Sequence, residues 1–227
     1  MRSLHARLRS CDRLQSRHTS RFEDYFEREV SCDADAPRHE WFDGVIYAMS
    51  RGTPEHGRLT SSITIALGNL LPPVCRIYAA DTTLYIPAAN LATYADVSVI
   101  CGPLETITVR KDGRSLGQAV INPIVIVEVL SDSTERYDRD GKFQLYQQIA
   151  ALREYVLVAQ DTPRIEVFRR DQQWAGEVAE SGTAIVIHGA AVDVDACIAR
   201  SAPHAMARDH SYDAARSAIS WCSTSRR

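Results

Sequence analysis

The chain has 227 residues, of which 45% are hydrophobic and 24% charged, and its formal net charge is −3. This length suits one domain with a full core, and no uninterrupted apolar run approaches the roughly 20 residues that would span a bilayer, so we expect no membrane role. The net charge gives no global attraction to nucleic acid, although residues 2–21 are arginine-rich and residues 22–43 are mostly acidic.

The six cysteines are scattered without a Cys-x-x-Cys pair, which argues against a zinc ribbon or a thioredoxin-like site. Cys75 and Cys101 flank or end apolar segments, and we expect both to be reduced core residues. Because the chain shows no signal-peptide pattern, the expected compartment is the reducing cytoplasm.

Three stretches divide the chain. Residues 1–20 lack an apolar period and are predicted to form a flexible basic arm, for which a solvated tail is a better explanation than a phosphate-binding segment. Residues 21–200 carry the signals of one domain, which begins with a short amphipathic helix indicated by the spacing of Phe22 and Phe26. Residues 201–227 are small, polar and weakly periodic, and this tail stays unassigned.

Residues 40–49 have the pattern of a hairpin with Asp-Gly at its turn, which brings Glu40 to the start of a sheet. Glu40 could be a carboxylate of a metal site. From spacing alone, however, we favour an exposed partner for Arg38 or His39.

A helix and several strands follow. Residues 56–71 carry apolar side chains at helical intervals and predict a helix that covers one face of the sheet. His56 near its start is more often a surface or capping-region histidine than a ligand, and a role facing the site stays open. Residues 75–80, 83–87 and 93–101 are predicted to be strands.

Asp96 lies near the beginning of the third of these strands, where alternation places Val97 and Val99 on one face and Asp96 on the other. A strand-edge aspartate bonded to turn amides explains Asp96 as well as a catalytic role does. Residues 102–121 then form a basic loop or hairpin with phosphate-binding potential, although a solvated charge run is the commoner explanation. Its candidate nucleic-acid contacts are Arg110, Lys111 and Arg114.

The run Ile124–Leu130 is β-branched and apolar, and it predicts a strand buried on both faces that only Glu128 interrupts. A buried carboxylate is costly unless a metal, a cation or hydrogen-bond donors compensate it. A helix predicted over residues 139–150 places Lys142 and Tyr146 on one face, where they could supply this compensation.

Asp138 is a candidate cap for this helix. After the helix, residues 154–159 and 164–169 are predicted to extend the sheet as antiparallel strands. Residues 184–187 are predicted to add its last edge.

A metal site explains Asp96, Glu128 and Lys142 together. Two carboxylates on neighbouring strands suit Mg²⁺, or Mn²⁺, because these ions prefer oxygen ligands. The bound water would be the nucleophile, and Lys142 would orient it and stabilise developing negative charge, which predicts metal-assisted hydrolysis of DNA phosphodiesters. Arg136 and Arg139 suit phosphate contacts better than chemistry.

Four segments together carry a resemblance to a known family: residues 39–49, 94–99, 127–135 and 137–146, followed by Arg153-Glu154-Tyr155. On these segments, the chain from Phe22 to Asp193 resembles the Uma-two family of restriction endonuclease-like proteins, a branch of the PD-(D/E)xK nuclease superfamily. The resemblance implies an α/β (α+β) nuclease core with a mixed central sheet flanked by helices.

The resemblance also implies functional residues. It makes Asp96 and Glu128 metal ligands, Lys142 the catalytic lysine and Glu40 an auxiliary acidic residue. Two positions depart from the superfamily pattern: Ala95 stands where a proline is usual, and Leu130 stands where a lysine is expected two residues after Glu128. Lys142 on the next helix is the expected replacement for the missing lysine.

Other functions stay open. A non-catalytic nuclease-fold module that binds nucleic acid or a protein partner would also fit the net negative charge and the arginine-rich outlying segments. Glycoside hydrolysis by paired carboxylates fits less well, because aromatic residues are few and Lys142 would have no role. Enzymes that cut both DNA strands are commonly dimers, and the sequence leaves a homodimer open.

Overall fold

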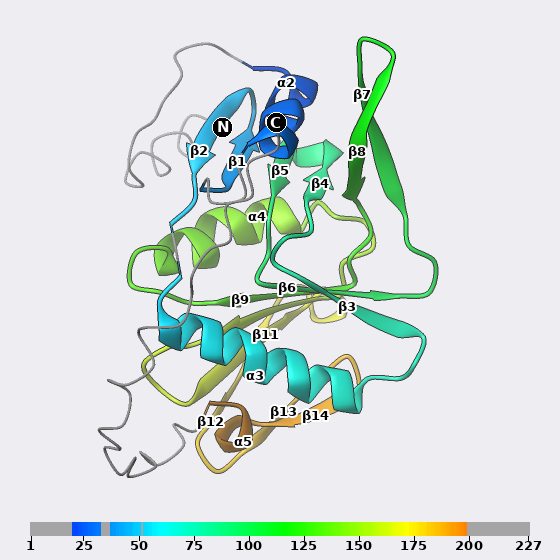
Figure 1. Cartoon of the computed structure of the whole chain (residues 1–227). Helices are drawn as coiled ribbons and strands as arrows, with labels where there is room; N and C mark the ends of the chain where they lie inside the picture. The colour runs from blue at the N-terminus through cyan, green and yellow to red at the C-terminus, as the bar shows by residue number, and fades with distance from the viewer. Residues whose placement is uncertain (1–19, 33–36, 51, 199–227) are drawn as a thin grey trace, which may run out of the picture.

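The computed structural model describes residues 20–32, 37–50 and 52–198, which form two six-stranded sheets, a two-stranded hairpin and the helices packed around them (Figure 1). Each large sheet contains one parallel strand pair among antiparallel ones, which confirms the predicted α+β class with mixed strands and flanking helices. The predicted arm over residues 1–20, except its last residue, and the tail over residues 201–227 lie outside the described residues.

The central sheet has the strand order β12-β11-β10-β9-β6-β3. In chain order its strands are β3 (Cys75–Ala79), β6 (Val97–Cys101), β9 (Val125–Val129), β10 (Glu154–Val158), β11 (Arg164–Arg169) and β12 (Gly176–Glu180). The prediction that residues 184–187 form the last edge is wrong. β12 takes that edge, while β13 (Ala184–Ile187) pairs with β14 (Ala190–Asp193) and buries Ile185 and Ile187 in the core beneath the sheet.

The second sheet has the order β2-β1-β5-β4-β8-β7. Its strands are β1 (His39–Phe42), β2 (Val45–Ala48), β4 (Leu84–Ile86), β5 (Leu91–Thr93), β7 (Thr106–Lys111) and β8 (Arg114–Val120), with a 3-10 turn at Pro87–Ala89. The predicted Asp-Gly hairpin is confirmed, because Asp43 and Gly44 both have positive φ, as a two-residue turn between twisted strands requires. The basic stretch at residues 102–121 is the long β7–β8 hairpin that projects in Figure 1.

Helix α3 (Pro54–Leu70) covers one face of the central sheet, as predicted (Figure 1). The Thr53 side chain accepts a hydrogen bond from the His56 N–H at 3.1 Å, which caps the first turn. Alternation along β9 sends Val125, Val127 and Val129 into the core under α3 and the intervening side chains to the opposite face.

The opposite face carries a helical segment that differs from the continuous helix expected at residues 139–150. A π-helical turn spans Tyr137–Lys142, and α4 follows at Phe143–Tyr146. Beyond α4, the Arg170 guanidinium donates to the carbonyls of Gln147, Ile149 and Leu152 and so satisfies backbone acceptors that no helix pairs.

The cap predicted at Asp138 is wrong. Asp138 lies inside the turn, because its N–H donates to the Thr134 carbonyl at 2.9 Å. Gly141 makes this turn possible, since a Cβ there would lie 2.5 Å from the Tyr137 ring. Asp138 and Lys142 are four positions apart, so this wide turn brings them to the same face of the segment.

The expectation that Cys75 and Cys101 are reduced is wrong. The two residues face each other in the pairing of β3 with β6, and their sulfurs form a disulfide. Spacing in the sequence gave no sign of this pairing, because it depends on the register of two strands with 26 residues of sequence separation.

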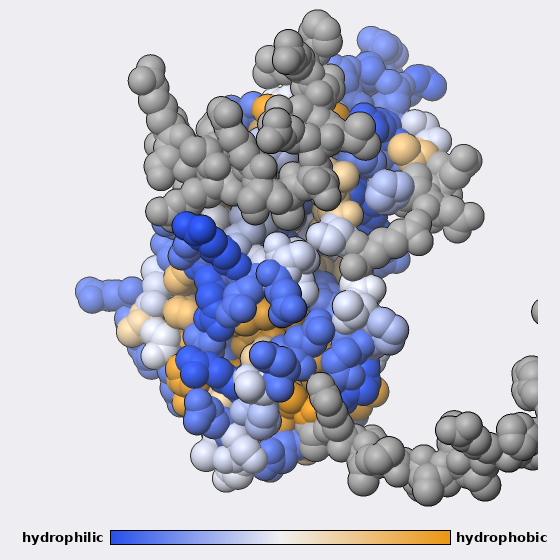
Figure 2. Space-filling model, turned by 90° about the vertical axis from the view of Figure 1, so that its left-hand side faces the viewer, coloured by the Kyte–Doolittle hydropathy of each residue, from blue (hydrophilic) through white to orange (hydrophobic). Residues whose placement is uncertain are grey.

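The remaining helices are α2 (Phe22–Ser31), which is the predicted amphipathic helix, and α5 (Val194–Ile198); a short 3-10 turn lies at Arg170–Gln172. Within the described part of the chain, no helix combines the length and apolar character needed to cross a bilayer. On the face shown in Figure 2, apolar side chains lie among hydrophilic ones.

Candidate active site

Glu128 lies in the middle of the central sheet, on β9 between β10 and β6. Its neighbours Val127 and Val129 point into the core under α3, so Glu128 points toward the segment that contains α4. The residue is 3% exposed. An enclosed carboxylate of this kind requires partners within hydrogen-bond distance.

Two donors from one helical face contact the same oxygen of Glu128. The Lys142 Nζ lies 3.1 Å and the Tyr146 hydroxyl 2.8 Å from Glu128 Oε1. The predicted four-residue spacing places both donors on one face. Leu130, which stands where the superfamily pattern has a lysine, packs in the apolar core. Lys142 from the helical segment supplies the cation beside Glu128 instead.

Asp96, directly before the neighbouring strand β6, forms hydrogen bonds with Glu128 and with the β9 backbone. The pairing of Val97 with Val127 sets Asp96, one residue earlier, opposite Glu128. The Asp96 N–H donates to Glu128 Oε2 at 3.3 Å, and the Val129 N–H donates to Asp96 Oδ2 at 2.7 Å. The backbone N–H that donates to the Asp96 carboxylate therefore belongs to β9, whereas the alternative interpretation of Asp96 expected turn amides.

His56 reaches Asp96 from the start of α3. Its Nε2 lies 3.2 Å from Asp96 Oδ2, and both side chains are 18% exposed. The hydrogen bond with Asp96 raises the pKa of His56, although partial burial opposes the shift. The backbone of His56 thus lies in the capped turn, as the sequence suggested, while its ring contacts the candidate site.

Glu40 and Asp138 complete the cluster around Lys142. The Lys142 Nζ lies 3.3 Å from Glu40 Oε1 and 3.5 Å from Asp138 Oδ1. The Tyr137 hydroxyl donates to Glu40 Oε2 at 3.0 Å, and the Thr93 hydroxyl donates to Glu40 Oε1. Three carboxyl groups therefore surround one ammonium group.

The interpretation of Glu40 as an exposed partner of Arg38 or His39 is wrong. Glu40 is 5% exposed, and His39 pairs instead with Glu29, with 2.8 Å between Nδ1 and Oε1. Arg38 donates to the Ala80 carbonyl. Glu40 is buried because Thr93, Tyr137 and Lys142, from distant segments, contact its carboxylate, which the sequence pattern did not reveal.

The electrostatics of the cluster favour a cation. Burial raises the pKa of Glu128 to about 8, which the carboxylates of Asp96 and Asp138 reinforce and the Lys142 ammonium opposes. Burial likewise raises the pKa of Asp138. Burial lowers the pKa of Lys142, but the surrounding carboxylates outweigh it and hold that pKa well above the ordinary value. Four carboxyl groups and one ammonium form an oxygen-rich, negatively biased donor set, which fits a hard divalent ion.

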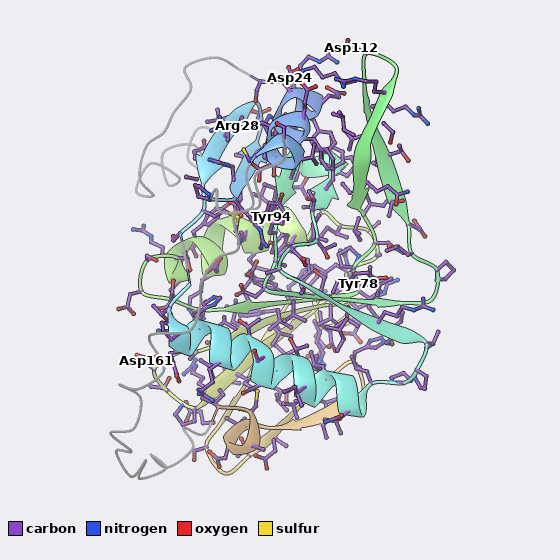
Figure 3. The ribbon with its side chains drawn as sticks, viewed as in Figure 1. Asp24, Arg28, Tyr78, Tyr94, Asp112 and Asp161 are labelled. Atoms are coloured by element: carbon purple, nitrogen blue, oxygen red, sulfur yellow. A yellow bond between two sulfur atoms is a disulfide. The ribbon has the colours of Figure 1, made fainter. Side chains whose placement is uncertain are left out.

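The predicted nucleic-acid contacts do not gather at this cluster. Arg110, Lys111 and Arg114 lie on the β7–β8 hairpin, whose tip at Asp112 lies at the same end of the molecule as Asp24 (Figure 3). The Lys111 Nζ lies 2.8 Å from Asp24 Oδ1 and 2.6 Å from Glu27 Oε2. Arg114 also contacts Glu27, at 3.1 Å.

The two candidate arginines before Lys142 differ in their surroundings. Arg136 is exposed next to the π-helical turn. Arg139 donates to both oxygens of Glu166, at 3.0 and 2.7 Å, and to Glu135 at 2.7 Å. Arg136 is therefore the more accessible of the two.

Sequence reasoning missed Asp138 and Tyr137 as members of the cluster and gave Tyr146 no firm role. The signal was present in the spacing, because Asp138, Lys142 and Tyr146 follow one another at four-residue intervals. Thr93 and Tyr137 left no such signal, since they reach Glu40 through contacts between distant segments.

Comparison with known proteins identifies the family of the chain. The profile of the Uma2 family, described as "Putative restriction endonuclease", matches residues 22–195. Two Synechocystis sp. proteins are similar: "Uncharacterized protein slr1290" is 36% identical over 140 residues, which cover 60% of this chain and 70% of that protein. "Uncharacterized protein sll1609" is 31% identical over 158 residues, which cover 66% and 82%.

A solved structure shares the fold. The crystal structure of "a putative nuclease belonging to DUF820" from Anabaena variabilis aligns with a TM-score of 0.52 and 15% identity, over 76% of this chain and 96% of that one. At this identity, the likeness shows a common architecture and leaves function to the site.

Proposed function

Because the chain belongs to the Uma2 family of restriction endonuclease-like proteins, we propose that it is a metal-dependent endonuclease that hydrolyses DNA phosphodiester bonds. One observation carries the proposal: Asp96 and Glu128 interlock across neighbouring strands, and the Lys142 Nζ lies 3.1 Å from Glu128 Oε1. Two acids can hold a metal ion that activates water, and a neighbouring lysine can stabilise negative charge on the phosphate, which together suit metal-assisted phosphodiester hydrolysis.

Asp96 and Glu128 would hold Mg²⁺ or Mn²⁺. Their oxygen donors suit these ions, and the 18% exposure of the Asp96 side chain gives the cluster its contact with solvent. When bound, such an ion supplies a water of lowered pKa and offsets the charge on a phosphoryl oxygen. Tyr146 holds Glu128 in place through its hydrogen bond to Oε1.

Lys142 acts as a fixed positive charge. Its pKa is raised well above the ordinary value, because the carboxylates around it outweigh the effect of burial, so it keeps its proton and cannot serve as a general base. It would orient the attacking water and stabilise negative charge that develops on the phosphate. Glu40 contacts the same Nζ and would position the lysine.

DNA would approach the cluster from the side on which the Asp96 side chain is partly exposed. Arg136 is exposed next to the π-helical turn that carries Lys142, and it would contact backbone phosphates there. Arg110 is exposed on the β7–β8 hairpin and would make a more distant contact. Phosphate contacts of this kind position the duplex and carry no sequence information.

Incubation of the purified chain with supercoiled plasmid and Mg²⁺ or Mn²⁺ tests the proposal. We expect nicked or linear product that chelation abolishes, and a loss of about 10²–10³-fold in rate for Asp96→Asn, Glu128→Gln and Lys142→Met. Asp112→Asn makes the same chemical change as Asp96→Asn at the exposed β7–β8 turn, where asparagine tolerates the positive φ, and should keep full activity.

Two outcomes would contradict the proposal. Cleavage that is unchanged in all three cluster variants would place the activity elsewhere. Metal-independent DNA binding that survives Glu128→Ala, without any cleavage, would support a non-catalytic module with a nuclease fold. Calorimetric titration of Mn²⁺ into wild type and Glu128→Gln gives a second readout that does not depend on activity.

A further inference from the structure

Cys75, Cys101 and His188 meet at the end of the central sheet that lies away from Asp96. Cys75 begins β3 and Cys101 ends β6, and the two residues face each other. The Gly102 N–H donates to the Val74 carbonyl at 3.1 Å, so Cys75 and Cys101 form a non-hydrogen-bonded pair, the arrangement with the shorter cross-strand distance.

His188 is brought to this pair by the tight turn between β13 and β14. His188 and Gly189 both have positive φ, which gives a two-residue hairpin turn. The His188 N–H donates to Glu154 Oε2 at 2.7 Å, which fixes the turn against the start of β10. One ring nitrogen of His188 and the two sulfurs all lie within 4.8 Å of one another.

We propose that these three residues form a zinc site when the cysteines are in the thiol state, and that the disulfide is its oxidised, metal-free form. Two thiolates and an imidazole are a preferred donor set for Zn²⁺. With Zn–S of about 2.3 Å and Zn–N of about 2.0–2.1 Å, tetrahedral ligand atoms lie roughly 3.5–4 Å apart, which the cluster reaches with small side-chain movements.

An ordinary reductant is enough to convert the disulfide form into the thiol form that binds zinc. A small-molecule dithiol transfers two electrons and two protons to the Cys75–Cys101 bond, which breaks to give two thiols while the dithiol closes to a cyclic disulfide. Zn²⁺ then displaces both thiol protons and takes the unprotonated ring nitrogen of His188. Water fills the fourth tetrahedral position.

The location gives the site a structural role. All three residues are half-buried, so a reductant and an ion can reach them. The ion would join the β13–β14 hairpin to the β3–β6 edge of the central sheet. Asp96 lies directly before β6 and precedes Cys101 by five positions, which corresponds to roughly 17 Å of extended chain. The zinc site is therefore independent of the proposed nuclease site.

Cobalt titration of the full chain, kept reduced with a phosphine, tests the site. We expect thiolate-to-cobalt charge-transfer absorption together with the intense visible bands of tetrahedral Co²⁺, saturating at one ion per chain. Stoichiometric Zn²⁺ should displace this signal. The oxidised chain should give no charge-transfer absorption.

Variants assign the ligands. Cys75→Ser should abolish the charge-transfer band or reduce it by half, and His188→Asn, which tolerates the positive φ of the turn, should weaken Co²⁺ binding at least about tenfold. Cys197→Ser is the matched control, because Cys197 is a free, buried cysteine outside the cluster. Should Cys75→Ser fail to fold, His188→Asn, which changes a hairpin turn outside the central sheet, still decides the question.

The proposal is overturned if the reduced chain gives no charge-transfer absorption, or if the signal is unchanged in both Cys75→Ser and His188→Asn. Glu128→Gln separates this test from the nuclease proposal. That variant should lose plasmid cleavage and keep the thiolate–cobalt signal, so either proposal can fail without the other.

Discussion

The chain has two lysines, and their surroundings differ sharply. Lys111 lies on the β7–β8 hairpin, where its Nζ contacts Asp24 and Glu27 at 2.8 and 2.6 Å and a quarter of the side chain is exposed. Lys142 contacts three carboxyl groups at longer distances of 3.1–3.5 Å, but only 7% of its side chain is exposed. Contact distance therefore does not distinguish the candidate catalytic lysine, Lys142, from the surface lysine, Lys111.

Solvent makes the difference. Around Lys111, water and salt screen the ion pairs, and such pairs contribute little to stability. Around Lys142 there is little water to stabilise the charged groups, so each ionised side chain must be stabilised by its neighbours. The pKa of Glu128, which burial raises, shows this effect. A buried group of this kind is expensive to maintain, which points to a role beyond holding the fold together.

The strongest test of this contrast is the activity of two matched variants. Lys142→Met should lower the rate of plasmid cleavage by about 10³-fold, because a positive charge near the reacting phosphate is lost. Lys111→Met makes the same substitution in a screened pair and should change the rate less than about threefold. Equal losses in the two variants would break the comparison.

The free energy of unfolding should also differ between Lys142→Met and Lys111→Met. Removing the Lys142 ammonium leaves three carboxyl groups buried without their cation, and we expect the free energy of unfolding to fall by about 3 kcal/mol at neutral pH. Urea unfolding followed by circular dichroism measures this loss. Lys111→Met should unfold close to wild type, and a destabilisation as large as that of Lys142→Met would show that burial is not the deciding factor.

The sequence predicted the difference between the surroundings of Lys142 and Lys111 only in part. The apolar run around Glu128 and the spacing of Lys142 and Tyr146 were enough to expect a compensated carboxylate, because both signals are local. The partner Asp96 was recognised from its strand, but its register with Glu128 was not readable.

What the sequence could not show depends on contacts between distant segments. The burial of Glu40 depends on Tyr137 and Lys142, which lie about 100 residues later in the chain, so the local pattern predicts an exposed residue. The Cys75–Cys101 pairing likewise depends on strand register. The carbonyl of Gln147, directly after α4, is bonded by Arg170, which lies far along the chain.

The pH dependence of stability sharpens the comparison at Glu128. Its folded pKa is about 8, above the value of 4.5 for a free side chain, so the folded chain binds more protons than the unfolded chain between these values. The metal-free protein should therefore lose stability as pH rises from about 4.5 to 8. Glu128→Gln should flatten this slope when unfolding is measured with a chelator present. A slope that is equally steep in the variant would show that Glu128 does not titrate in this range.

The smallest expected effects concern DNA binding by two arginines, Arg136 and Arg139, which differ in exposure and in ion pairing as the two lysines do. Arg136→Gln should weaken DNA binding severalfold and reduce the salt dependence by about one phosphate contact, because this side chain is exposed. Arg139→Gln should leave the salt slope nearly unchanged, since three nitrogen atoms of Arg139 already donate to Glu135 and Glu166. Fluorescence anisotropy of a labelled duplex at several salt concentrations measures both slopes. If Arg139→Gln gave the larger change, the ion pairs of Arg139 would have to open on DNA binding, and accessibility in the free protein would not identify its phosphate contacts.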